Sequence, residues 1–445
     1  MVMTAWMKGG SRLKPRSDDG ARASRAWPAG IAAAGIAWYA SDSLRHRREG
    51  GKGYTLRGDV DVGSPRFLRV VEALTGAPVS EGNHAELLIN GDRIFPAYLE
   101  TIAGAEHTLN LLTYAYWTGD ITREVAEAVC ARARAGVECN MLVDALGGAR
   151  MDSSLLAPMA EAGVTFAHFR PVKPYAVRRL TNRTHRKILV ADGRVAMTGG
   201  VGIAEEWTGD AHDPDHWRDT HVRVRGPVVL GLQGAFAENW LEATGEVLAG
   251  EGYLPELDPV EDGGPMQVMR SSAGVGDTDV EALYFLAIAS AKRSLDLAAA
   301  YFAPRPAFIE ALLEAASRGV AVRILLPGSH IDKEVVRVAG RSSYDQLLEA
   351  GIRVFEYMPT MLHAKTMVVD GVWSSVGSVN FDNRSFQLHD EATLCVQSEA
   401  FAALLTETFV EDLDAAEEFT LERWRARPLR KRVAEGSSRM LRREL

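Results

Sequence analysis

The distribution of apolar residues along the chain predicts the same succession of elements twice. Segment 100–117 (ETIAGAEHTLNLLTYAYW) reads as the end of a helix followed by a strand of alternating apolar residues. An Ala-rich helical pattern comes next and ends at Gly136, where a helix C-cap is expected, and an apolar strand follows directly. The second copy starts at Leu286 (LAIASAKRSLDLAAAYFAP), and its capping glycine is Gly319. Strands that alternate with helices predict parallel strands with crossover helices.

The two copies continue in step and define the expected domains. THRKILVADGRVAMTGG in the first copy matches LHAKTMVVDGVWSSVGS in the second. We therefore predict an α/β fold of two similar halves, each a mixed or parallel sheet flanked by helices, facing each other about a pseudo-two-fold axis. The expected ranges are a first half at 63–258, a linker at 259–265 around Gly263–Gly264, and a second half at 266–422.

Both halves carry the pattern His-x-Lys-x4-Asp in equivalent contexts. The six residues, taken as the catalytic candidates, are His185, Lys187, Asp192, His363, Lys365 and Asp370. Residues i and i+2 of a strand face the same side, so each histidine and its lysine are expected to point into one site. Each aspartate precedes a glycine between two apolar runs, which is a hairpin signal. We therefore interpret both aspartates as turn-forming or structural rather than directly catalytic.

Small and polar residues after each hairpin are candidates for binding or orienting a phosphate. Gly200 lets the backbone approach an oxyanion closely, while Ser378 and Asn380 add hydrogen-bond donors. Asp219 and Glu391 each begin an alternating strand further on, where a carboxylate could hold an imidazole in one tautomer.

Two histidines and two lysines point to phosphodiester chemistry that uses no metal or other cofactor. One histidine would attack phosphorus and form a phospho-histidine, while the other would protonate the leaving alkoxide and then deprotonate the incoming alcohol or water. The lysines and Asn380 would stabilise charge on the phosphoryl oxygens. The three scattered cysteines, Cys130, Cys139 and Cys395, form neither a disulfide framework nor a C-x-x-C metal pair.

Charge is distributed unevenly over the 445 residues. Residues 1–58 and 423–445 each carry a net charge of +7, which leaves −23 on the residues between them, given the total of −9. Such an acidic body argues against nucleic acid as a partner and favours basic ends that reach an anionic membrane surface. The basic N-terminal region 1–62 contains an uncharged apolar segment at 26–41, and 423–445 is a basic tail. We expect 26–41 to be a short apolar helix that attaches to the membrane as a single anchor or at the interface, in either orientation.

Longer blocks around the motifs resemble a known family. The paired motifs are similar to those of the phospholipase D superfamily, and the flanking blocks resemble its bacterial cardiolipin synthases. These blocks are GGVGIAEEW from Gly199, WRDTHVRVRGPVV from Trp217, YFAP from Tyr301, RSSYDQLLEAGIRVFEY from Arg341, MLHAKTMVVDG from Met361 and VGSVNFDNRSFQLHDE from Val376. The resemblance covers most of residues 85–445. It implies a site shared by the two halves and a location at the bacterial inner membrane, with a single short anchor or peripheral.

The resemblance also implies a reaction, namely formation of cardiolipin and glycerol from two phosphatidylglycerol molecules through a phosphatidyl-histidine. It makes His185 the nucleophile and His363 the acid and base, whereas the residues alone leave this order open. Phospholipase D-type hydrolysis and, less favoured, a phosphodiesterase or nuclease activity are the alternatives. The acceptor alcohol and the oligomeric state stay open. The chain departs from the family pattern at Gly202, where the family has Asn, and at His389, where Asn is common.

Overall fold

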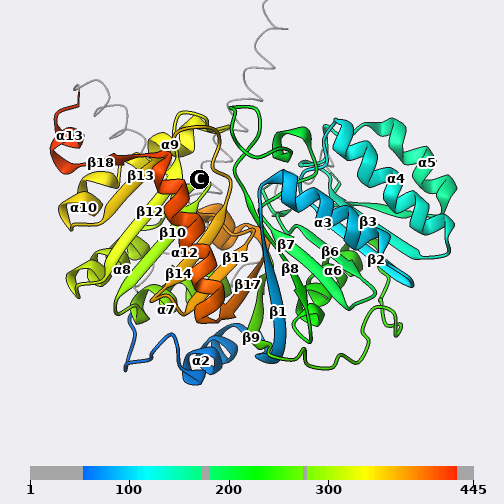
Figure 1. The fold of residues 1–445 in the computed structure, drawn as a ribbon, viewed down its shortest axis with the longest axis horizontal. Coiled ribbons are helices and arrows are strands. Elements are labelled where there is room, and N and C mark those ends of the chain that lie inside the picture. The colour runs from blue at the N-terminus through cyan, green and yellow to red at the C-terminus, as the bar shows by residue number, and fades with distance from the viewer. Residues whose placement is uncertain (1–53, 172–180, 274–277, 428–445) are drawn as a thin grey trace, which may run out of the picture. The chain divides into compact units, whose positions relative to one another are not determined.

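The fold is one continuous mixed sheet with helices on both faces (Figure 1). The computed structural model describes residues 54–171, 181–273 and 278–427. The main strands run in the order β18-β13-β12-β10-β14-β15-β17-β9-β1-β8-β7-β6-β2-β3-β4. Their bounds in the N-terminal half are β1 (Ser80–Ile89), β2 (Thr108–Thr113), β3 (Glu138–Asp144), β4 (Thr165–Phe169), β6 (Ile188–Ala191), β7 (Val195–Gly199) and β8 (Thr220–Arg225). In the C-terminal half they are β9 (Gly264–Ser271), β10 (Ser294–Ala299), β12 (Ala321–Pro327), β13 (Arg353–Tyr357), β14 (Lys365–Val369), β15 (Trp373–Gly377), β17 (His389–Gln397) and β18 (Ala416–Phe419).

The strand order confirms the two-half prediction. Read outward from the central antiparallel pair β1–β9, each side presents an equivalent series, and β18 is an extra strand at one edge. In each half three strands are parallel, as the crossover pattern predicts: β2, β3 and β4 on one side, and β10, β12 and β13 on the other. The motif strands β6 and β14 run antiparallel to β2 and β10. The halves are therefore related by a pseudo-two-fold axis at the β1–β9 pair.

Helices cover the sheet and join the halves. The helices are α2 (Pro65–Thr75), α3 (Gly91–Ala103), α4 (Asp120–Arg134), α5 (Leu156–Ala162), α6 (Val229–Thr244), α7 (Asp279–Ser290), α8 (Pro306–Ser317), α9 (Glu334–Arg341), α10 (Tyr344–Glu349), α11 (Asn383–Gln387), α12 (Glu399–Asp414) and α13 (Leu421–Arg425). One core cluster contains Val222 of β8 together with Leu394 of β17 and Phe401 of α12. Apolar burial thus runs across the axis without interruption.

Several segments pack in a different part of the fold from the domain range in which the sequence places them. Helix α2, inside the range expected for the first half, packs on α7 of the second half and adds Phe67 to its core. Val60 and Val62, expected in the N-terminal region, join the same core. Strand β9 begins at Gly264, inside the expected linker. In the expected basic tail, Trp424 is buried and its ring lies 4.9 Å from that of Tyr344.

The apolar segment 26–41 lies outside the described residues, as does the tail beyond Arg427. Among the helices that the structure does describe, none combines the length and apolar character needed to cross a bilayer.

A buried histidine outside the motifs predicts acid sensitivity of the fold. His221 of β8 is buried, and neither ring nitrogen finds a hydrogen-bond partner among the described residues. Burial lowers its pKa to about 4. The unfolded chain, in which histidine has a pKa of about 6.5, therefore binds more protons between pH 6.5 and 4, so stability falls as the pH falls through this window. At pH 5 the loss should be about 2 kcal/mol relative to pH 8.

Urea unfolding of His221→Leu at pH 5 and pH 8 tests this expectation. The difference in unfolding free energy between the two pH values should shrink by about 2 kcal/mol in the variant. His84→Leu, at an exposed position of β1, should keep the wild-type difference. An equal pH dependence in His221→Leu and wild type would contradict the prediction.

Candidate active site

The two motif histidines lie where the halves meet. His185 follows the short strand β5 (Arg183–Thr184), which pairs in parallel with the start of β17. The backbone N–H of His185 donates to the carbonyl of Asp390 at 2.8 Å. On the other side, Arg218 and Leu362 form a parallel bridge, and the N–H of His363 donates to the carbonyl of Arg218 at 2.7 Å. Each motif segment therefore pairs with the backbone of the opposite half.

The carboxylate beside each motif histidine also comes from the opposite half. Nδ1 of His185 lies 3.1 Å from both carboxylate oxygens of Glu391, and Nδ1 of His363 lies 2.7 Å from Oδ2 of Asp219. All four side chains are buried. Each imidazole thus receives its carboxylate from the other half. A carboxylate on Nδ1 fixes the tautomer in which Nε2 is the basic nitrogen, which suits a nucleophile or proton carrier.

Burial sets the protonation of the two imidazoles. It lowers the pKa of His363 to about 4, with a further contribution from the charge of Lys365, and it lowers that of His185 well below its ordinary value. Burial opposes ionisation of Asp219 and Glu391 as well, but the histidines beside them outweigh it and hold both carboxyl pKa values low. At neutral pH the free site therefore holds neutral imidazoles.

The two lysines converge on the same place. Nζ of Lys187 donates to the carbonyl of His185 at 2.7 Å, and Nζ of Lys365 lies 2.8 Å from Nδ1 of His363. Burial lowers the pKa of Lys365 to about 8 and lowers that of Lys187 well below its ordinary value, with Lys365 adding to the effect on Lys187. A phosphate bound between them would favour their charged forms, because an anion offsets both the desolvation and the mutual repulsion.

The motif aspartates lie at the other end of the motif strands. The carboxylate of Asp192 accepts the backbone N–H groups of 106–108, and that of Asp370 accepts those of 292–294. Both have a left-handed backbone, with φ of 54° and 55°. They tie the hairpin to the loop before β2 or β10 and contact neither motif histidine. These backbone contacts favour the structural role that their place in the two turns predicts.

The expected phosphate-orienting residues divide into two groups. A Cβ at Gly200 would lie 2.1 Å from Oδ1 of Asp219, so only glycine fits against that carboxylate. At the equivalent place in the second half, the Ser378 hydroxyl donates to Glu391. Residues 200 and 378 therefore contact the two site carboxylates and help to position them. Asn380 is buried, and its acceptor Oδ1 has no hydrogen-bond partner among the described residues.

Gly202, which stands where the family pattern has Asn, is explained by steric contacts. A Cβ there would lie 2.9 Å from that of Ala115 and 3.1 Å from the Trp207 ring. Trp207 fills the place where an asparagine side chain would reach, and its Nε1–H donates to Oδ2 of Asp219 at 2.9 Å. The site therefore differs between its two halves.

Aromatic neighbours of the histidines were not predicted. The rings of Trp207 and Trp217 lie 5.2 and 5.4 Å from that of His363, whereas His185 faces Tyr114 and His389 at 5.4 and 5.5 Å. The strand registers make Asp219 equivalent to Glu391, and Trp217 equivalent to His389.

The sequence does hold a signal for two of these neighbours. Trp217 and His389 each stand two residues before the site carboxylate. This is the same-face spacing that joins each motif histidine to its lysine.

Known proteins are similar to this chain in sequence or in fold. The family model described as cardiolipin synthase, PLD-like domain, matches residues 98–213 and 284–413. A cardiolipin synthase from Geobacillus kaustophilus is 35% identical over 377 residues, which is 84% of this chain and 75% of the relative. Cardiolipin synthase 2 from Bacillus anthracis is 32% identical, over 84% of this chain and 73% of its own length. The crystal structure of a phosphatidylserine synthase from Haemophilus influenzae superposes with a TM-score of 0.63 at 12% identity, over 85% of this chain and all of that one, and so shares the fold. The two motif-bearing halves and these matches together show that the chain belongs to the cardiolipin synthase family.

Proposed function

We propose that the protein is a phosphatidyltransferase that converts two phosphatidylglycerol molecules into cardiolipin and glycerol. The observation that carries the proposal is the pair of buried imidazoles, each bound at Nδ1 by a carboxylate of the other half, with two lysines beside them. The relatives named cardiolipin synthase support cardiolipin as the product. The nuclease alternative is disfavoured by the net charge of −23 on the residues between the basic ends.

The first step forms a bond between Nε2 of His185 and phosphorus and breaks the bond from phosphorus to the glycerol oxygen. His363 gives its Nε2 proton to that oxygen, and glycerol leaves. The bound phosphate favours the protonated form of His363, because its charge offsets the repulsion from Lys365. Lys187, Lys365 and Asn380 would stabilise the equatorial oxygens.

The second step reverses these roles. A glycerol hydroxyl of the second phosphatidylglycerol loses its proton to His363 and attacks phosphorus. The bond between phosphorus and His185 breaks, and cardiolipin forms. Water in place of that hydroxyl would give phosphatidic acid, so the outcome depends on how well water is excluded from the site.

A lipid-product assay tests the proposal. Purified full-length protein would be mixed with phosphatidylglycerol vesicles in the presence of EDTA, and the products identified by mass spectrometry. Cardiolipin and glycerol in equal amounts are expected. Phosphatidic acid alone would replace the proposal with a phospholipase D-type hydrolysis, and no turnover of any phospholipid would overturn both.

We also propose that the edge of the sheet around the site docks on the membrane. The carboxyl ends of β3, β12 and β13 lie at the edge where β6 and β14 begin, because Ile188 pairs with Leu112 and Lys365 with Ala299 near the ends of β2 and β10. Three large apolar side chains in the segments after these strands are exposed: Leu146 after β3, Met358 after β13, and Val335 in α9, which follows β12. Such residues beside a lipid-processing site support insertion into the interface.

Replacing Leu146, Val335 and Met358 together by serine should lower activity on phosphatidylglycerol vesicles about tenfold or more. Each large apolar side chain that is buried in the membrane should contribute about 1.5–3 kcal/mol to the free energy of membrane binding. Activity on a short-chain, monomeric phosphatidylglycerol should stay near wild type. The matched control replaces Leu241, Val247 and Leu254, which are at least as exposed. Leu254 precedes Pro255, which lies beside the Asp192 turn at the opposite edge. An equal loss in both triple variants would argue against docking through this edge.

A further inference from the structure

A third histidine extends the carboxylate pair on one side of the site only. His185, His389 and Glu391 each offer a ligand atom, and the three atoms lie within 4.8 Å of one another. Nδ1 of His389 lies 3.7 Å from Oε1 of Glu391 and makes no hydrogen bond with any described residue, although the atom is buried. His185 and Glu391 are buried as well.

This arrangement is not required by the pseudo-symmetry. The residue equivalent to His389 in the other half is Trp217, which packs on His363 but offers no ligand atom to a metal. Within the part of the chain that the structure describes, the pair His363–Asp219 therefore has no third donor of this kind, and the combination of two imidazoles with one carboxylate is found on the His185 side.

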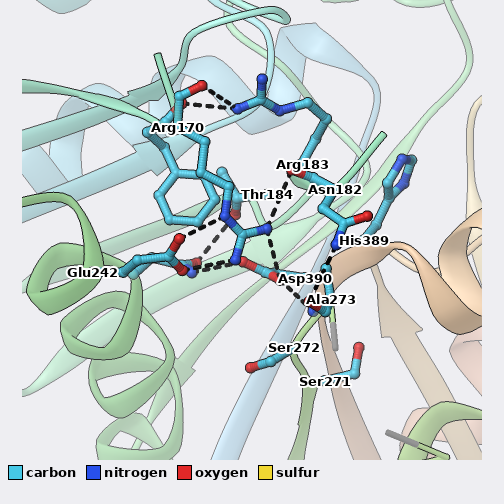
Figure 2. Close-up of polar contacts among 12 residues, drawn as sticks. Arg170, Asn182, Arg183, Thr184, Glu242, Ser271, Ser272, Ala273, His389 and Asp390 are labelled. Carbon is cyan, nitrogen blue, oxygen red and sulfur yellow. Dashed lines mark hydrogen bonds and ion pairs between the residues drawn. The ribbon is translucent and has the colours of Figure 1, made fainter. Parts of the chain in front are cut away.

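The segment that carries His389 is fixed from several directions, as Figure 2 shows around Asp390. His389 pairs with Arg183 of β5, and the Asp390 carboxylate accepts the backbone N–H of Ala273 at 2.5 Å and Nδ2 of Asn239 at 2.8 Å. Arg170 lies 3.8 Å from the same carboxylate and forms a bidentate pair with Glu242. The backbone of His389 is thereby held in place before any ligand arrives.

We propose that His185, His389 and Glu391 bind a divalent cation of borderline softness, best matched by Zn²⁺, and that this cation inhibits the transferase. Two imidazoles and one carboxylate form a donor set that Zn²⁺ takes with a fourth position for water, whereas Mg²⁺ and Ca²⁺ prefer oxygen ligands. Coordination of His185 would use its lone pair or separate it from Glu391. Either change removes the nucleophile from the reaction. The inhibition rests on the proposed function, but the binding does not.

Binding is tested directly on the full-length protein after treatment with a chelator and dialysis. Titration with ZnCl₂ against a chromophoric chelator should give one site, and Co²⁺ should give the intense visible bands of a tetrahedral complex. In His389→Asn the affinity for Zn²⁺ should fall at least about tenfold, and the Co²⁺ bands should be lost. His212→Asn is the matched control, because His212 is exposed and pairs with Asp210 rather than with a member of the proposed site. It should bind like wild type, and thermal unfolding checks that every variant is folded.

The activity measurement is kept separate. Cardiolipin formation should fall with the same Zn²⁺ midpoint as binding and recover on addition of EDTA. Unchanged Zn²⁺ binding in both His389→Asn and His185→Ala would overturn the proposed site. Stimulation of turnover by Zn²⁺ would overturn the proposed inhibition. Binding that depends on His389 in a protein without transferase activity would support the site while the proposed function fails.

Discussion

His185→Ala and His363→Ala should each lower cardiolipin formation by at least about 10³-fold. The first variant loses the atom that bonds to phosphorus, and the second loses the group that moves the proton in both steps. General acid–base catalysis alone accounts for about 10²–10⁴-fold, and loss of a nucleophile costs as much or more. Rates would be measured on phosphatidylglycerol vesicles as cardiolipin and glycerol released.

The comparison needs folded protein, because both side chains are buried and both contact a buried carboxylate. Thermal unfolding midpoints and circular dichroism of the variants serve as the control, with His363→Gln as a more conservative replacement. His212→Ala, which removes an exposed histidine, should keep wild-type activity. Near-normal turnover in a folded His185 or His363 variant would contradict the two-histidine mechanism.

Glu391→Gln and Asp219→Asn should each lower turnover by about 10²–10⁴-fold, the effect expected when an amide replaces the carboxylate that orients a catalytic imidazole. The structure further predicts which histidine each carboxylate serves. Glu391 should behave like His185, and Asp219 like His363, although each pair spans the two halves.

A substrate with a good leaving group separates the two pairs. Phosphatidyl-p-nitrophenol needs little protonation of its leaving oxygen, so the variant that lacks the proton donor should still release one equivalent of nitrophenolate in a burst. We expect the burst in His363→Ala and Asp219→Asn, and no burst in His185→Ala and Glu391→Gln. If His363 were the nucleophile, the two classes would exchange, but the members of each pair would stay together. A burst shared by His363→Ala and Glu391→Gln, or by His185→Ala and Asp219→Asn, and absent from the other two variants, would show that each carboxylate serves its own half.

Local pattern in the sequence determined the two-half fold and the identity of the reacting groups. Alternating strands and Ala-rich helices predicted the parallel strands β2–β3 and β10–β12, because periodicity records which face of each element is buried. The His-x-Lys spacing placed each lysine beside its histidine for the same reason. The Asp-Gly signals at Asp192 and Asp370 predicted turns, and the structure has a left-handed backbone at both aspartates.

Tertiary structure alone decided how these groups are combined. The exchange of carboxylates arises because Arg218, just before Asp219, forms a bridge with the segment before His363, and the strand that begins at His389 pairs with the segment before His185. Contacts between residues more than a hundred positions apart leave no trace in local periodicity, so the sequence offered Asp219 and Glu391 without saying which imidazole each would hold. The same pairing brings Trp217 onto His363 and His389 onto His185. Two motifs with the same His-x-Lys-x4-Asp pattern thereby acquire different surroundings, two tryptophans at His363 and a tyrosine and a third histidine at His185.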